Sequence, residues 1–345
     1  MNMQWRPYGW NQPGAEELPP LKKNANFVGV LMLALVGASL TLPSALLMLL
    51  QVLDIADLSQ VNYGLSKMGY LCFQTAAYLL YLALPAVVVA LVMRRDLSPF
   101  PTRRVRPSVL VPAVMTGLGL MVLANLVASI LMNILSSFGL PQPTSTDTMD
   151  TTVLSLALNL VSTAILPALV EEMVFRGYIL GALRPQGDGL AIVFSAVFFG
   201  LLHGNLLQIP FAFILGLIFG YLTVQTGSIW PAVLLHFLNN ALSVALQYAG
   251  QFLPGLEAQG MLNGAAFTIM AALGVMGAAI LWAGHRHGDT APQAILRPVG
   301  NGFSELSVSR RVGHILLSPA VILSLVGLVG ITALNIASSL LEQLS

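Results

Sequence analysis

Three charged residues in the middle of the chain stand at the end of an apolar run. Glu171, Glu172 and Arg176 follow the uncharged stretch 152–170, which is about as long as a helix that crosses a bilayer. Glu172 and Arg176 are four residues apart with the acid first, the favourable order for an ion pair within one helix. Glu171 points about a quarter-turn away and has no basic partner on its own helix. We expect Glu172 and Arg176 to pair as structural support and Glu171 to be available for chemistry. The alternative is a helix that ends at the lipid headgroups, with all three charges in water.

Two histidines and an asparagine follow within later apolar stretches. His203 lies near the end of one stretch, and His236 and Asn240 share a face of another. Polar side chains at membrane depth usually face a bundle interior or a water-filled cavity. Counted from the turns at 184–189 and 227–228, all three residues and Glu171 lie about 12–20 Å deep. The sequence therefore predicts one polar layer that lines a cavity inside the membrane.

The composition indicates a protein that crosses the membrane several times. The chain is 56% hydrophobic and 8% charged, with a mean hydropathy of +0.81, whereas soluble domains carry about 25% charged residues. A single cysteine excludes an intrachain disulfide and a cysteine-based metal site. No basic patch with interleaved aromatic residues points to nucleic acid. The expected surroundings are the lipid bilayer.

The predicted fold is all-α, a polytopic transmembrane bundle of about eight or nine membrane helices. A flexible cytoplasmic tail is expected over 1–26, with no cleavable signal peptide, and a single transmembrane domain over 27–345, with its catalytic core at about 150–250. The long fourth segment must tilt, protrude or bend, and Pro167 is the expected bend. The apolar segments are 27–50, 69–93, 109–135, 152–184, 190–207, 210–225, 230–249, 261–283 and 314–341.

Basic residues in the connecting loops predict the orientation. Lys and Arg precede the first segment and occupy the loops after the second and eighth, and Arg184 ends the fourth. The loop after the third segment carries only acidic charges. Because Lys and Arg concentrate on the cytoplasmic side, we expect a cytoplasmic N-terminus and a location in the plasma membrane.

The three motifs together resemble those of the CAAX prenyl protease type II and bacteriocin-processing family of intramembrane endopeptidases. The family pattern EExxxR, FxxxH, HxxxN/D appears here as EEMVFR (Glu171 to Arg176), FGLLH (Phe199 to His203) and HFLNN with Asn240, in that order. The resemblance covers roughly residues 150–250. It implies that Glu171 and His203 activate a water, that His236 and Asn240 bind the oxyanion, and that Glu172 and Arg176 hold the site together. The implied substrate is a membrane-associated protein or peptide, with lipidated chains among the candidates.

Two questions stay open from the sequence. Glu171, His203 and His236 are three nitrogen and oxygen ligands, enough for a catalytic zinc; we favour metal-free catalysis without a cofactor, because only one carboxylate is unpaired and it cannot easily be both ligand and base. The same polar cluster would also suit a membrane transporter or a non-catalytic immunity or scaffold protein. No pair of matching broken segments indicates the inverted repeats of a transporter.

Overall fold

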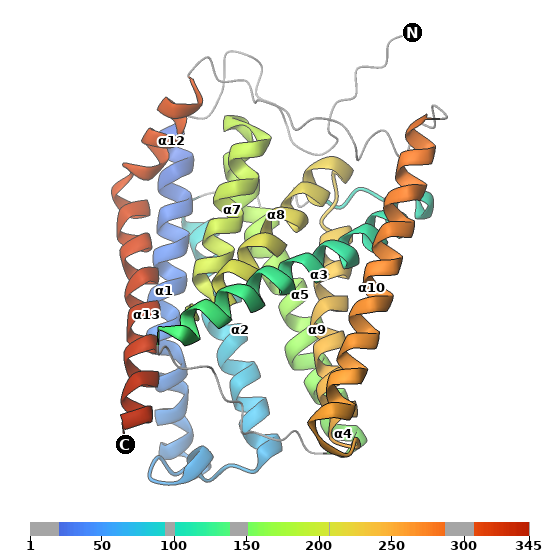
Figure 1. Ribbon diagram of the computed structural model, residues 1–345. Helices are drawn as coiled ribbons and strands as arrows, with labels where there is room; N and C mark the ends of the chain where they lie inside the picture. Colours follow the sequence, from blue (N-terminus) through green and yellow to red (C-terminus); the bar gives the residue numbers. More distant parts are fainter. Residues whose placement is uncertain (1–20, 94–100, 139–150, 207, 287–306, 345) are drawn as a thin grey trace.

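In a computed structural model, the chain folds into a bundle of long helices (Figure 1). The structure describes residues 21–93, 101–138, 151–206, 208–286 and 307–344, so most of the predicted tail and several basic and acidic loop residues lie outside the described part. Within these ranges, eight helices are long and apolar enough to cross a membrane, and a ninth, α7 (Asp188–Leu202), is shorter. The predicted all-α membrane bundle is confirmed, and the protein is an integral membrane protein.

The long helices account for most of the described chain. They are α1 (Leu21–Val52), α2 (Lys67–Val92), α3 (Pro107–Ser137), a composite helix (Val153–Gln186), α8 (Gln208–Thr226), α9 (Trp230–Gly250), α10 (Gly255–Arg286) and α13 (Pro319–Leu344). The short helix α12 (Val308–Leu316) precedes α13, and the turn η1 (Val61–Gly64) precedes α2.

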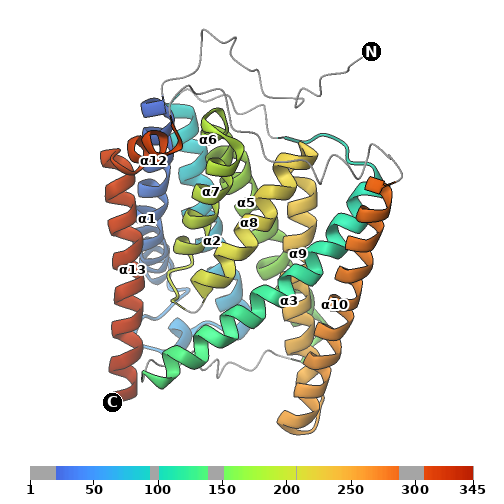
Figure 2. The ribbon, with the colours of Figure 1, turned by 45° about the horizontal axis from the view of Figure 1, so that its top comes forward.

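The helices form a central group with flanking pairs. α1 and α13 pack side by side at one edge, and α10 stands at the other edge against α3. Figure 2 shows α3 running obliquely across the bundle towards the top of α10. Gly119 of α3 lies so close to Gly274 of α10 that an added Cβ would be 2.7 Å from the Gly274 Cα. Between these edges lie α7, α8, α9 and the composite helix, which carry the predicted polar residues.

The close approach of α7 and α8 depends on glycine. A Cβ on Gly216 of α8 would lie 2.8 Å from the Ala196 Cα in α7, closer than carbon atoms normally pack. The turn from α8 to α9 uses Gly227 in the left-handed region (φ 64°), and Ser228 pairs with Thr102 ahead of α3. These contacts fix where α9 begins, and so set the depth of the histidine and asparagine that α9 carries.

Four predicted boundaries were wrong, and one of them is the start of α10, which lies at Gly255 rather than at 261. α1 begins at Leu21, so 21–26 are helical rather than part of a flexible tail; here Asn24 is buried and the Ser318 hydroxyl donates to Asn26 Oδ1 at 2.7 Å. α7 ends at Leu202 because Gly204 takes a left-handed conformation (φ 62°). The predicted last segment divides into α12 and α13 because Pro319 cannot continue a helix and instead starts a new one.

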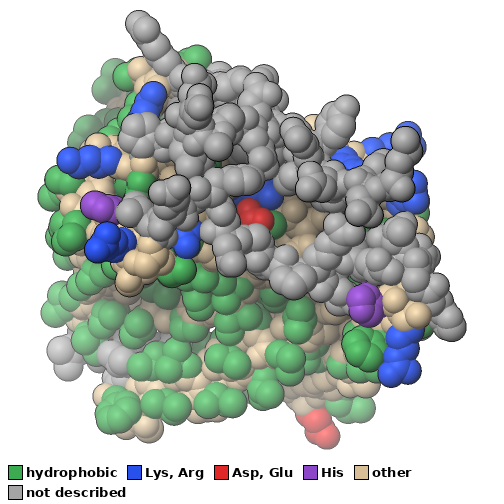
Figure 3. All heavy atoms as spheres, turned by 90° about the horizontal axis from the view of Figure 1, so that it is seen from above, with side chains coloured by type: hydrophobic (Ala, Val, Ile, Leu, Met, Phe, Trp, Pro, Cys, Tyr) green, Lys and Arg blue, Asp and Glu red, His purple; other side chains and the backbone are tan. Residues whose placement is uncertain are grey.

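Charge is distributed unevenly between the two ends of the bundle. At the end where α1 and α3 begin, basic side chains gather around the described surface (Figure 3). The described basic residues at this end are Lys22, Lys23, Arg103, Arg104, Arg106, Arg184, Arg286, Arg310 and Arg311. The opposite end includes Asp54, Asp57 and Glu257 together with one described basic residue, Lys67, and α13 runs towards it. This asymmetry agrees with the loop-charge argument but does not test the orientation.

Candidate active site

The composite helix that carries the two glutamates is wound irregularly. It runs through α4 (Val153–Asn159), the π-helical turn η2 (Leu160–Ile165), α5 (Leu166–Glu172), the π-helical turn η3 (Met173–Ile179), α6 (Leu180–Leu183) and the 3₁₀ turn η4 (Arg184–Gln186). One π-helical turn directly precedes the predicted bend at Pro167, and another directly follows the glutamates. An extra residue in a turn rotates everything after it by about 100°, so η2 changes the direction in which the acidic side chains point and η3 changes the direction of the residues that follow them.

The Asn240 side chain of α9 is hydrogen-bonded to the composite helix near Pro167. Pro167 has no N–H, so it cannot donate to the carbonyl of Thr163 four residues earlier. The Asn240 side chain donates Nδ2 to that carbonyl at 2.9 Å, and Asn239 donates to Asn240 Oδ1 at 2.9 Å. Asn240 thus connects α9 to the irregular helix. Binding an oxyanion, its predicted role, would use its second amide hydrogen.

Glu172 is fully buried and touches two partners. Its Oε2 lies 3.1 Å from Arg176 Nε, which is the ion pair expected from the spacing. Its Oε1 lies 2.9 Å from His236 Nδ1, a contact that the sequence did not predict. The Arg176 guanidinium carbon sits 4.4 Å from the centre of the Phe199 ring. A charged arginine with no exposed surface is therefore held by one carboxylate and by aromatic faces.

One carboxylate oxygen of Glu171 accepts a hydrogen bond, and the other has no hydrogen-bond partner among the described residues. The hydroxyl of Tyr78, from α2, donates to Glu171 Oε1 at 2.6 Å. Glu171 Oε2 is buried, has no hydrogen-bond partner among the described residues, and lies 3.9 Å from His236 Nε2. Sequence reasoning missed Tyr78. A tyrosine within an apolar run was the available signal, because a buried hydroxyl usually has a hydrogen-bond partner.

Hydrogen bonds assign the tautomers of both histidines. His236 Nδ1 faces the ion-paired Glu172 carboxylate, which can only accept, so Nδ1 carries the hydrogen. His203 closes the C-terminal end of α7 by donating Nδ1 to the Phe199 carbonyl at 2.8 Å. In their neutral forms, both rings therefore have a lone pair on Nε2. For His236 to bind an oxyanion, as predicted, the ring would have to carry both hydrogens.

The four predicted residues meet at one cavity. Glu171, His203, His236 and Asn240 all line a cavity of about 400 Å³ between the composite helix, α7, α8 and α9. The convergence predicted by counting depth is thus present. Sequence reasoning missed six polar residues that line the same space: Asn159, Thr163, Gln208, Asn239, Ser243 and Gln247.

The alternative zinc ligands are Glu171, His203 and His236. Glu171 Oε2 and the Nε2 atoms of His203 and His236 have lone pairs of the kind that zinc accepts. Across the described residues, however, no three His, Cys, Asp or Glu side chains are placed so that they could hold a metal ion. As arranged, the three residues do not fit a zinc site. Whether the protein uses a metal stays a prediction for experiment.

Comparison with known proteins bears on this block of the chain. Residues 153–242 match the family model described as type II CAAX prenyl endopeptidase Rce1-like. The block that holds the site is thus similar to this endopeptidase family. The matched residues include Glu171, Glu172, Arg176, His203, His236 and Asn240, so the resemblance inferred from the three motifs is confirmed.

A curated relative agrees with the Rce1-like match. Over 94 residues the chain is 29% identical to the "Putative membrane peptidase YdiL" of Bacillus subtilis (strain 168). The similar region is 27% of this chain and 38% of that protein. No solved structure matches the chain.

Proposed function

We propose that the protein is an intramembrane endopeptidase that hydrolyses a peptide bond of a membrane-associated protein or peptide through a water activated by Glu171. One observation carries the proposal: Glu171 lines the cavity, and its buried Oε2 has no hydrogen-bond partner among the described residues. A buried carboxylate oxygen with a free lone pair is what a general base needs. The Rce1-like match supports the same reaction class.

The proposed mechanism begins with a water between Glu171 and the scissile carbonyl. Glu171 Oε2 takes a proton from this water while the water oxygen bonds to the carbonyl carbon, and the C=O electron pair moves to the oxygen. When the C–N bond breaks, the proton passes to the leaving amine. Tyr78 donates to the other oxygen of Glu171 and so fixes the orientation of the carboxylate. His203 offers its Nε2 lone pair to the same water from the end of α7.

Stabilisation of the oxyanion is assigned to α9. Asn240 has a second amide hydrogen, and His236 in its doubly protonated form would present Nε2–H to the cavity. Glu172 and Arg176 hold neighbouring groups in place. Glu172 orients the His236 ring, and Arg176 Nη2 donates to the Gly216 carbonyl of α8 at 3.3 Å. No step in this scheme uses a metal or cofactor. The metal-free mechanism rests on the donor arrangement described above.

The proposed orientation places the basic end of the bundle in the cytoplasm. Lysine and arginine in short loops favour the cytoplasmic side, and the described basic residues gather at the end where α1 begins. The N-terminus would then be cytoplasmic and the plasma membrane the location. Labelling of single cysteines introduced at Glu257 and at Lys22, in a Cys72→Ser background, tests it. Only the variant at Glu257 should react in intact cells with a reagent that cannot cross membranes.

The test of the reaction compares wild type with Glu171→Gln. Glutamine keeps the shape and still accepts from Tyr78 but cannot take the proton, so cleavage should fall by about 10²- to 10⁴-fold. Protein termini are compared in membranes of cells that express either form. A new terminus that needs wild-type protein supports the proposal, and reconstituted protein should produce it from the purified substrate. Cleavage at equal rates in both forms removes Glu171 from the chemistry. Substrate-dependent solute flux with no cleavage would favour a transporter.

A further inference from the structure

A second cavity opens beside the first one. It has a volume of about 560 Å³ and lies between α9, α10, α3 and α8. It shares four lining residues with the candidate active site: Phe211, Asn239, Ser243 and Gln247. A ligand in the second cavity would therefore lie along the same walls that lead to Glu171.

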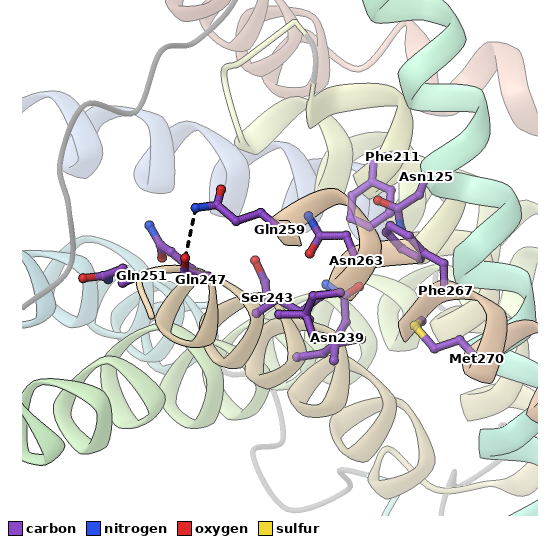
Figure 4. Close-up of a pocket in the computed structure, with 14 residues that line it drawn as sticks. Asn125, Phe211, Asn239, Ser243, Gln247, Gln251, Gln259, Asn263, Phe267 and Met270 are labelled. Carbon is purple, nitrogen blue, oxygen red and sulfur yellow. Dashed lines mark hydrogen bonds between the residues drawn. The ribbon is translucent and has the colours of Figure 1, made fainter. Parts of the chain in front are cut away.

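The lining is rich in carboxamides, and the described residues that form it are uncharged. Figure 4 shows side chains from α9 and α10 around one space, with Phe267 and Met270 towards the end where Asn125 of α3 lies. The polar lining residues are Asn125, Asn239, Ser243, Gln247, Gln251, Gln259 and Asn263, and no Asp, Glu, Lys, Arg or His of the described part of the chain lines this cavity. Uncharged polar side chains within membrane helices are costly unless they have partners. This many on one wall indicates a polar ligand.

Much of this polar surface is not used for holding the helices together. Gln259 donates to the Gly250 carbonyl at 2.9 Å, and Asn125 donates to a carbonyl of its own helix. Among the described residues, in contrast, Ser243 and Gln247 make no side-chain hydrogen bond, and the buried Gln251 Nε2 has no partner. Helix-to-helix hydrogen bonds are the usual use of such residues in membranes. Here the free groups are left for something that enters the cavity.

We propose that this cavity, which we call the carboxamide trough, binds an uncharged extended segment of the substrate chain next to the scissile bond. A carboxamide offers a donor and an acceptor in the same geometry as a peptide group, so it suits a backbone. Phe211, Phe267 and Met270 would contact apolar side chains of the segment. A charged side chain would enter a space without a counter-charge, at a high desolvation cost. The proposal deepens the endopeptidase function and rests on it.

The geometry gives the length and direction of the segment. From Asn239 to Gln251, α9 rises by about 18 Å, which an extended chain covers with about five residues. Gln251 lies at the turn between α9 and α10, the end of the bundle that holds Glu257. The trough thus opens away from the basic end. Under the proposed orientation, the substrate segment reaches Glu171 from the outer side of the membrane.

The first test detects binding without needing cleavage. A photo-reactive benzophenone amino acid replaces Leu262, which lines the trough, in Glu171→Gln protein in lipid nanodiscs. The probe is a biotin-labelled peptide with a Leu/Ala membrane anchor and a Ser/Thr/Gly tail, and the matched control site is Leu323, exposed on α13. Cross-linking should be about tenfold higher at 262. A tail with alternating lysines should compete poorly. Equal cross-linking at both sites overturns the proposal.

The second test uses the catalytic readout on the identified substrate. Replacing Gln247 and Asn263 together by leucine removes two carboxamides, and the loss of two neutral hydrogen bonds should raise KM about tenfold with kcat unchanged. Asn133→Leu, at an exposed position of α3 outside both cavities, should change neither constant. Cleavage with unchanged KM in the double variant, and no preferred cross-link at 262, overturns the trough and leaves the protease intact. Cross-linking at 262 without any cleavage by wild type overturns the protease and leaves a binding site.

Discussion

Replacing Glu172 by alanine should be far more damaging to stability than replacing the neighbouring Glu171 by glutamine. Glu172 is the only described carboxylate with an oxygen within 4.0 Å of the fully buried guanidinium of Arg176, at 3.1 Å from its Nε. Removing one partner of a buried ion pair costs about 3–5 kcal/mol, because the other charge stays buried. The rings of Phe199 and Phe219, 4.4 and 5.2 Å from the guanidinium carbon, remain in the variant and do not alter this difference. Glu171→Gln keeps the acceptor for Tyr78 and should cost about 1 kcal/mol.

The assay is equilibrium unfolding in mixed micelles by titration with sodium dodecyl sulfate, followed by tryptophan fluorescence. Glu172→Ala should lower the free energy of unfolding by about 3–5 kcal/mol relative to wild type. The double variant Glu172→Ala/Arg176→Met should regain part of this loss, because no charge is then left buried without a partner. Equal losses of unfolding free energy for Glu172→Ala and Glu171→Gln would refute the assignment of Glu172 to stability and of Glu171 to catalysis. Absence of any recovery in the double variant would show that the unpaired arginine is not the cause.

The remaining predictions concern the base and the metal. Tyr78→Phe should lower kcat/KM about tenfold or more, because a hydrogen bond to a charged group is worth about 1.5–3 kcal/mol. The control is Tyr81→Phe, since the Tyr81 ring lies 5.5 Å from that of Tyr78, and this variant should cleave at close to the wild-type rate. Equal rates for the two variants would remove Tyr78 from the site. Purified protein should contain no stoichiometric zinc by elemental analysis, and chelation should leave turnover nearly unchanged. About one zinc per chain that is lost in His203→Ala would overturn the metal-free mechanism, since a catalytic zinc is held by about three protein ligands.

The sequence alone determined the architecture and the depth of the site. Long uncharged stretches have to be membrane helices, because only a helix satisfies its own backbone hydrogen bonds in lipid. The pairing of Glu172 with Arg176 follows from helical spacing alone, and the structure shows it. Depth can be counted because each residue of a helix rises by about 1.5 Å. For this reason Glu171, His203, His236 and Asn240 could be placed in one layer before any tertiary contact was known.

The tertiary structure decided which atoms face each other. Depth does not give rotation about the helix axis, and two π-helical turns change that rotation within the helix that carries Glu171. The contact between Tyr78 and Glu171 joins residues 93 apart in sequence, and the contact between His236 and Glu172 joins residues 64 apart. Such contacts depend on how closely neighbouring helices approach, which is set by the packing of the whole bundle. The carboxamide trough has the same origin: its residues are scattered over α3, α8, α9 and α10, and only the packing of these helices brings them to one space.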